Sequence, residues 1–157
     1  MFGNQARPKA CFTLWLGLQQ RLLTADRLLK WGLEATKICV LCNRVPENHE
    51  HLFVLCPVAR TLWARILTWS NKGMFNVVHW EDFMKWSVAS SKGKGQQAQI
   101  CKMIINAEVL HTLWRERNQR IFEKKSVTVE RLAKDLAYVC TVRAPTGSQV
   151  LVQNFSF

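Results

Sequence analysis

The chain has 157 residues, 48% of them hydrophobic, and a formal net charge of +11 at pH 7. This length suits one domain, or one domain with an appendage, and the apolar content excludes a wholly disordered chain. The positive charge favours an anionic partner, with nucleic acid ahead of an acidic membrane surface. The alternative is a solvated basic surface that binds nothing specific.

The N-terminal residues and the cysteines bear on the cellular compartment. Residues 1–9 are polar and lack the apolar core of a signal peptide, and no apolar run reaches the roughly 18 residues of a membrane span. Cys11, Cys101 and Cys140 stand among apolar residues at helical intervals, where a thiol acts as a small hydrophobe. A disulfide framework would require secretion. We therefore expect a reducing compartment, nuclear or cytoplasmic, and no membrane partner.

Two helices are predicted before the first cysteine pair. Pro8 suits the first turn of a helix. Phe12 and Trp15 follow at helical spacing among other apolar residues, which predicts a helix buried on two sides. Thr24 suits the N-cap of a second helix, and Gly32 suits its end.

The loop that follows the second helix carries a metal-binding pattern. Cys39, Cys42, His51 and Cys56 are spaced C-x2-C-x8-H-x4-C. Thiolates and imidazole are the ligands that Zn²⁺ prefers, and four of them close a tetrahedral structural site with no position open for a catalytic water. The turn from Cys39 to Cys42 is the expected zinc knuckle.

A helical stripe of apolar residues begins beside the histidine and is interrupted by Pro57. The stripe consists of Leu52, Leu55, Cys56, Ala59, Leu62, Trp63, Ile66 and Leu67. In an ideal helix, a five-residue step places His51 and Cys56 well apart around the axis. Proline disfavours helical geometry in the residue before it. A kink or a helix start at Cys56–Pro57 therefore allows both side chains to reach one metal ion.

The remainder of the chain also reads as α-helical. We predict a connector over 71–78, a short helix over 80–89, a linker over 90–95 and a long helix with apolar residues from Ile100 to Phe122. Thr128 suits the cap of a last helix, whose apolar face consists of Val129, Leu132, Ala133, Leu136, Ala137 and Cys140. The predicted fold class is mainly α: a helical zinc-binding domain with one zinc knuckle, followed by a C-terminal helical extension.

Two stretches of this sequence resemble a known family. RPKACFTLWLGLQQRLLTADRLLKWGL, then CVLC, then ENHEHLFVLCPVARTLW resemble the reverse transcriptase zinc-binding domain near the C-terminus of plant LINE-type non-LTR retrotransposon polyproteins. This resemblance runs from Arg7 to Trp69. A weaker one covers HTLWRERNQRIFEKK, from His111 to Lys125, which is similar to the W-x-x-R-N-x-R-x-F segment after that domain.

The resemblance implies specific zinc ligands and domain boundaries. It gives Cys39, Cys42, His51 and Cys56 as ligands of Zn²⁺, with His51 preferred because it directly precedes Leu-Phe. His49 is the rival, and a four-ligand site accepts only one of the two. The implied organisation is an N-terminally truncated zinc-binding domain over 7–70, a connector with a short helix over 71–95, a helical extension over 96–143 and a flexible tail over 144–157.

The sequence departs from a whole polyprotein in ways that argue against an enzyme. No Tyr/Phe-x-Asp-Asp motif of a polymerase is present, and the adjacent acidic pair Glu81–Asp82 lies where a helix is expected to begin. No carboxylate set of an endonuclease or a ribonuclease H is evident among the eleven acidic residues. We therefore expect a fragment of such an element, or a gene derived from one.

Three functions are compatible with these features. The first is a non-catalytic module that binds RNA or DNA without sequence specificity; the second is a docking module for other domains of the polyprotein; the third is a degenerate fragment. The predicted phosphate-binding side chains are Arg7, Lys9, Arg21, Arg27, Lys30, Lys37 and Arg44. The charge run over 115–125 reads as a solvated helix face. Four tryptophans, Trp31, Trp69, Trp80 and Trp86, include candidates for a base-stacking platform.

Overall fold

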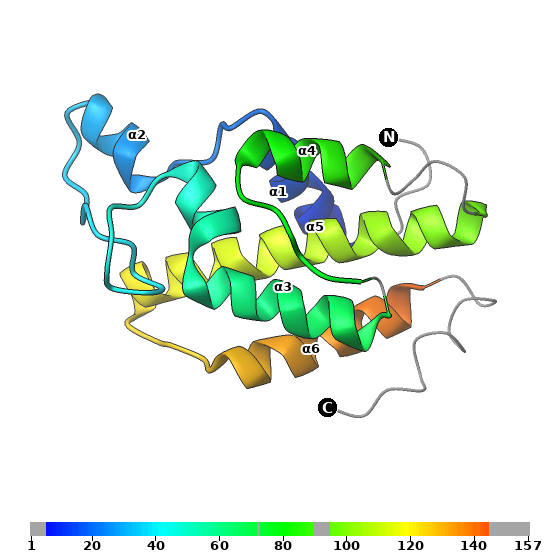
Figure 1. Ribbon diagram of the computed structural model, residues 1–157. Coiled ribbons are helices and arrows are strands. Elements are labelled where there is room, and N and C mark those ends of the chain that lie inside the picture. Colours follow the sequence, from blue (N-terminus) through cyan, green and yellow to red (C-terminus); the bar gives the residue numbers. More distant parts are fainter. Residues whose placement is uncertain (1–5, 72, 90–94, 145–157) are drawn as a thin grey trace.

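The computed structural model describes residues 6–71, 73–89 and 95–144, and within them the chain is helical and has no β-strand (Figure 1). Its elements are α1 (Pro8–Leu18), α2 (Ala25–Lys30), the π-helical turn η1 (His51–Leu55), α3 (Pro57–Trp69), α4 (Trp80–Ala89), α5 (Gln96–Asn118), the π-helical turn η2 (Gln119–Glu123) and α6 (Val129–Arg143). The predicted fold class, mainly α, is confirmed.

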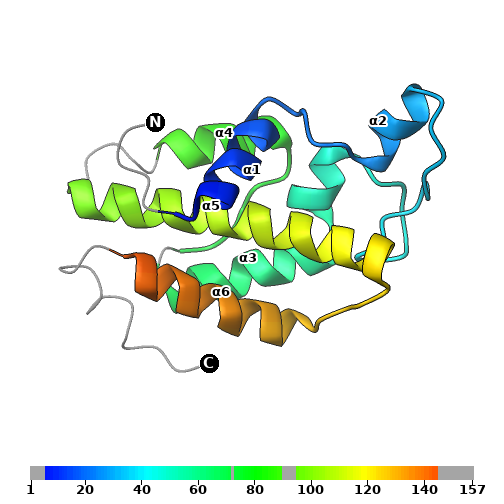
Figure 2. The ribbon, with the colours of Figure 1, turned by 180° about the vertical axis from the view of Figure 1, so that it is seen from behind.

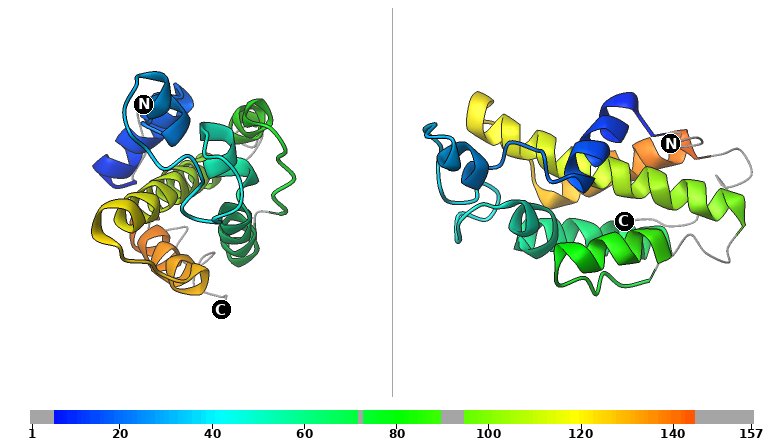
Figure 3. Two further views of the ribbon diagram at one scale, coloured as in Figure 1. Left: turned by 90° about the vertical axis from the view of Figure 1, so that its left-hand side faces the viewer. Right: turned by 90° about the horizontal axis from the view of Figure 1, so that it is seen from above.

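The long helix α5 runs through the middle of the molecule. Helices α1, α3 and α6 pack against it, and α3 and α6 also pack against each other. In Figures 1 and 2, α1 and α4 lie on one side of α5, and α3 and α6 on the other. The end-on view in Figure 3 shows these helices around α5. Helix α2 and the loop after it lie at one end of this bundle (Figure 1).

One hydrophobic cluster joins both halves of the chain, from Ala10 in α1 to Cys140 in α6. Trp63 is fully buried in it, as predicted. Its indole N–H donates to the carbonyl oxygen of Phe53 at 3.0 Å, and its ring stacks on Phe75 with the centroids 4.9 Å apart, so this bulky side chain keeps a hydrogen bond when buried. The predicted domain boundaries stay predictions, and the packing is continuous across them.

Helix α1 meets α5 through small residues rather than through the bulky apolar residues that the sequence suggested. Ala10, Thr13 and Gly17 are buried, whereas Phe12 is 59% exposed. A Cβ atom added at Gly17 would lie 3.0 Å from the side chain of Leu110, so glycine permits the close approach of the two helices. The prediction of burial on two sides was wrong for Phe12, which turns to solvent, whereas Leu14, Leu16 and Leu18 are half-buried and pack against the core.

The other helix boundaries agree closely with the sequence patterns. Helix α4 spans the predicted residues, and Thr128 caps α6 by accepting the N–H of Arg131 at 3.4 Å. Phe122 is 76% exposed, which corrects its place on the buried stripe: α5 gives way to η2 before this residue. Of the predicted linker and tail, 90–94 and 145–157 lie outside the described residues. Within the described part, no helix is long and apolar enough to cross a membrane.

Candidate metal centre

Residues 37–47 fold into a tight turn that carries the first two candidate ligands. The N–H of Cys39 donates to the carbonyl of Val45 at 2.9 Å, and the N–H of Asn43 donates to the carbonyl of Cys39 at 2.8 Å. Asn43 adopts a left-handed φ of 54°, a conformation that asparagine tolerates better than most residues. This backbone arrangement brings the thiols of Cys39 and Cys42 to one place.

The other two candidate ligands come from the segment that leads into α3. The side-chain oxygen of Asn48 accepts the N–H of His51 at 2.7 Å and fixes the start of η1. The N–H of Cys56 donates to the carbonyl of His51 at 2.6 Å, an i→i+5 bond that closes a wider turn than that of an α-helix. Cys56 has a ψ of 128°, and α3 begins at Pro57. The predicted break at Cys56–Pro57 is confirmed.

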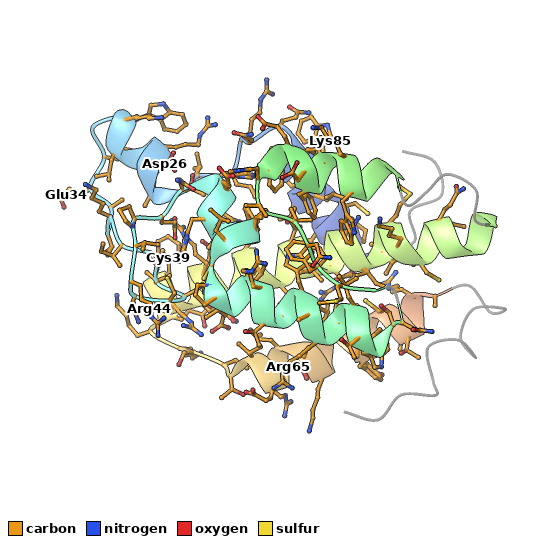
Figure 4. All side chains as sticks on the ribbon, viewed as in Figure 1. Asp26, Glu34, Cys39, Arg44, Arg65 and Lys85 are labelled. Atoms are coloured by element: carbon orange, nitrogen blue, oxygen red, sulfur yellow. The ribbon has the colours of Figure 1, made fainter. Side chains whose placement is uncertain are left out.

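The four predicted ligands meet in one cluster near the loop end of the bundle (Figure 4, where Cys39 is labelled). One ligand atom from each of Cys39, Cys42, His51 and Cys56 lies within 4.8 Å of the others. The Sγ atom of Cys42 lies 3.3 Å from Nε2 of His51. Zn–S bonds of about 2.3 Å and Zn–N bonds of about 2.0 Å separate tetrahedral ligands by roughly 3.5 Å. Small side-chain adjustments therefore suffice to close a zinc site.

The protonation equilibria of Cys56 and His51 suit metal ligation, whereas that of Cys39 favours the thiol. A hydrogen bond with Cys39 lowers the pKa of Cys56, against the effect of burial, and the backbone N–H groups of Ala59 and Val58 in the first turn of α3 lower it further. The same hydrogen bond raises the pKa of Cys39. Burial lowers the pKa of His51, which keeps its imidazole neutral at pH 7. Thiolate and neutral imidazole are the forms that bind Zn²⁺.

His49, the rival ligand, lies outside the cluster. Its side chain is 7% exposed, and its ring centroid lies 4.9 Å from that of Phe53 and 4.2 Å from that of Trp80. Burial lowers the pKa of His49 to about 4, so at neutral pH it packs as an uncharged ring. The geometry thus groups His51, and not His49, with the three thiols.

The turn over residues 37–47, which we call the metal turn, is held by an arginine of the C-terminal half to which no sequence pattern assigned a role. Arg120 in η2 donates from Nη1 to the carbonyl oxygens of Val40 at 3.3 Å and Leu41 at 3.1 Å, the two residues between the paired cysteines. Its Nε donates to Oε1 of Glu116 at 2.7 Å, and that carboxylate is buried. Arg120 therefore ties the backbone of the turn to the end of α5.

A second, more deeply buried ion pair joins Glu47, at the end of the metal turn, to α5 and α2. The side chains of Arg117 and Glu47 are 4% and 1% exposed, with Nη2 and Oε1 2.8 Å apart. Glu47 Oε1 also accepts the N–H of Ala25, the first residue of α2, at 2.8 Å. Treating 115–125 as a solvated face was therefore wrong for Arg117 and Arg120. The available sequence signal was the weaker resemblance to the W-x-x-R-N-x-R segment.

The predicted phosphate-binding side chains have different environments. Arg7 is partly buried and pairs with the buried carboxylate of Glu108 at 2.6 Å. Arg27 donates to the carbonyl of Gln20 and lies over the ring of Trp31. The other five are exposed: Lys9, Arg21, Lys30, Lys37 and Arg44. Contact of any of the seven with phosphate stays a prediction.

Residues 1–63 match the family model described as zinc-binding in reverse transcriptase. The match supports a reverse transcriptase zinc-binding domain. It includes all four residues of the cluster, and it ends within α3, before the predicted limit of Trp69. This domain is a zinc-binding accessory and not a catalytic unit. Comparisons with curated proteins and with solved structures gave no match. The plant, LINE-type origin stays a prediction.

Proposed function

We propose that this chain is a zinc-binding module of a reverse transcriptase that binds nucleic acid and catalyses no reaction. The observation that carries the proposal is the meeting of Cys39, Cys42, His51 and Cys56 within 4.8 Å, inside the segment that matches the zinc-binding family model. Zn²⁺ at this position joins the loop to the start of α3. With four protein ligands, its role is structural.

Nucleic-acid binding rests on the charge that surrounds the metal turn. Lys30, Lys37 and Arg44 are exposed on α2 and on the loop that carries the first cysteine pair, and the whole chain has a formal net charge of +11. Lysines and arginines spread over a surface favour contacts with phosphates, which position a nucleic acid without reading its bases. We therefore propose weak, sequence-tolerant and salt-dependent binding of RNA or DNA.

A docking site for another domain of the polyprotein is the second candidate function. Apolar side chains beside the metal turn favour it: Ile38 is 38% exposed and Val45 is 42% exposed. In this alternative the basic surface meets an acidic protein surface instead of phosphates. The two functions differ in what they predict for the isolated chain, because only the first predicts affinity for an oligonucleotide.

The test is metal analysis of the purified full chain, followed by fluorescence-anisotropy titration of a labelled single-stranded oligonucleotide at 50 and 150 mM salt. About one zinc per chain and an affinity that falls steeply with salt are expected. The triple variant Lys30→Gln/Lys37→Gln/Arg44→Gln should lower the slope of log K against log salt by up to about 2, at roughly 0.7 per lost phosphate contact.

A matched control removes equal charge elsewhere. Lys85, Lys134 and Arg143 are exposed on α4 and α6, and changing all three to Gln should leave the slope nearly unchanged. An equal loss in both triple variants would show an effect of net charge only. Absence of oligonucleotide binding at low salt, in a zinc-loaded chain, would favour the docking function instead.

A further inference from the structure

Exposed apolar and basic side chains share one end of the molecule. We call residues 21–46, which comprise α2 and all of the metal turn except Glu47, the α2 lobe; it lies at one end of the bundle (Figure 1). Six large apolar side chains are exposed on it: Leu23, Leu29, Trp31, Leu33, Ile38 and Val45. Five basic residues and two acidic residues accompany them in the sequence of the lobe. Figure 4 labels Asp26, Glu34 and Arg44 at this end.

Trp31 is the aromatic residue of this surface, and its backbone is held firmly. Of the four tryptophans left open by the sequence, Trp69 and Trp80 are buried and Trp86 is half-buried, whereas Trp31 is 58% exposed. It stands at the C-cap of α2.

The residues after Trp31 form a Schellman motif. The N–H of Gly32 donates to the carbonyl of Leu29 at 3.0 Å, and the N–H of Leu33 donates to the carbonyl of Leu28 at 3.0 Å. Gly32 has a φ of 72°, which glycine adopts without strain. The backbone at Trp31 is therefore fixed before any partner binds, which reduces the entropy lost on binding.

A cation lies over the ring of Trp31. The guanidinium carbon of Arg27 is 5.3 Å from the ring centroid, and Nη1 of Arg27 donates to the carbonyl of Gln20. Arg27 thus covers part of the indole from a fixed position and adds a cation–π contact. An exposed aromatic ring combined with a guanidinium and nearby lysines is the arrangement by which proteins bind unpaired bases together with their phosphates.

We infer that Trp31 is a base-stacking platform and that the α2 lobe binds single-stranded nucleic acid. This inference rests on the proposed function and makes it specific, because a stacking platform requires bases that are free of a duplex. The charge of the lobe favours a nucleic acid over a protein segment as the occupant, since five basic residues oppose two acidic ones. Stacking on an aromatic ring accepts any base, so the binding is sequence-tolerant.

The experiment measures the affinity of the zinc-loaded full chain for labelled 12-nucleotide oligo(dT) and oligo(rU), and for a 12-base-pair duplex DNA. Trp31→Ala should weaken binding of both single strands about 5- to 150-fold, the range for loss of one stacked base. Trp31→Phe, which keeps a ring, should restore most of the affinity. Tyr138→Ala is the control, because Tyr138 is 72% exposed on α6, and this change should have no effect. Zinc content and far-UV circular dichroism check that each variant folds.

The outcomes separate this inference from the proposed function. Loss of single-strand affinity in Trp31→Ala, with duplex affinity unchanged and with rescue by Phe, supports the platform. Equal losses for single strands and duplex overturn it, and so does an affinity that Trp31→Ala leaves intact; in both cases the chain still binds nucleic acid. No binding of any oligonucleotide by the unchanged chain overturns the platform together with the proposed function. In that case the lobe is a protein-docking surface.

Discussion

Removing Arg117 should destabilise this protein more than any change in its exposed charges. The carboxylate of Glu47 is 1% exposed and receives hydrogen bonds from Nη2 and Nε of Arg117 and from the N–H of Ala25. In Arg117→Met, a buried charge keeps one backbone donor and loses its counterion. Breaking a buried pair in this way costs about 3–5 kcal/mol, which corresponds to a fall in melting temperature of roughly 6–20 °C for a chain of this length.

The double variant Arg117→Met/Glu47→Leu isolates the cause of this destabilisation. It removes both charges but leaves the buried N–H of Ala25 without its acceptor. The loss of that hydrogen bond should lower the free energy of unfolding by about 1–3 kcal/mol. The double variant should therefore be more stable than Arg117→Met. The control is Arg131→Met, because Arg131 is 71% exposed and pairs with Asp135 on the surface of α6. That change should cost at most about 0.5 kcal/mol.

The assay is urea unfolding followed by far-UV circular dichroism, with zinc in excess so that metal loss does not add to the result. Fits to the linear dependence on urea give the free energy of unfolding of each variant. The reasoning fails if the double variant is as unstable as Arg117→Met, because the stranded carboxylate would then not be the source of the loss.

Three further predictions concern the metal centre and catalysis. His51→Ala should lose zinc in metal analysis, whereas His49→Ala should keep about one zinc per chain. His49→Ala should also lower the free energy of unfolding by roughly 2–4 kcal/mol, because it leaves a cavity. The opposite zinc contents would contradict the grouping of His51 with the three thiols. Arg120→Ala should weaken zinc binding by about 10-fold in a competition with a chelator, which is within the range for residues that orient ligands. An unchanged affinity would show that the turn keeps its conformation without Arg120. A template-dependent incorporation assay should detect no nucleotide transfer by the purified chain, since two-metal catalysis needs paired carboxylates; incorporation above a mock preparation would refute this.

The helices and the cluster of Cys39, Cys42, His51 and Cys56 were predictable because their signals are local. Thr24 and Thr128 occupy N-caps, and Pro8 and Pro57 open helices, as their residue types favour. The C-x2-C-x8-H-x4-C spacing similarly pointed to the four residues that the fold brings together. In each case the chemistry of a few neighbouring residues determines the outcome.

Burial of charge was not predictable in the same way, because it depends on contacts between residues far apart in the chain. Nothing within the charge run indicates that Arg117 pairs with a carboxylate 70 residues away. The prediction of which residues of α1 are buried was wrong at Phe12 for a related reason. Phe12 carries a stronger apolar signal than Gly17, yet the close approach of α5 to Gly17 selects the face with small residues.

The two arginines of the C-terminal segment explain why that segment belongs with the metal centre. In the proposed function, Zn²⁺ joins the turn of Cys39 and Cys42 to the start of α3, but one metal site does not by itself fix the orientation of the rest of the loop. Arg120 holds the carbonyl groups inside the turn, and Arg117 holds Glu47 at its far end. Arg117 lies in the last turn of α5 and Arg120 in η2 directly after it. Helix α5 is packed into the hydrophobic cluster through α1, α3 and α6. In the same proposal the metal closes the loop, and the arginines set the orientation of the loop relative to the bundle. In that proposal, this division of roles fixes the geometry of the α2 lobe, which is the proposed binding surface.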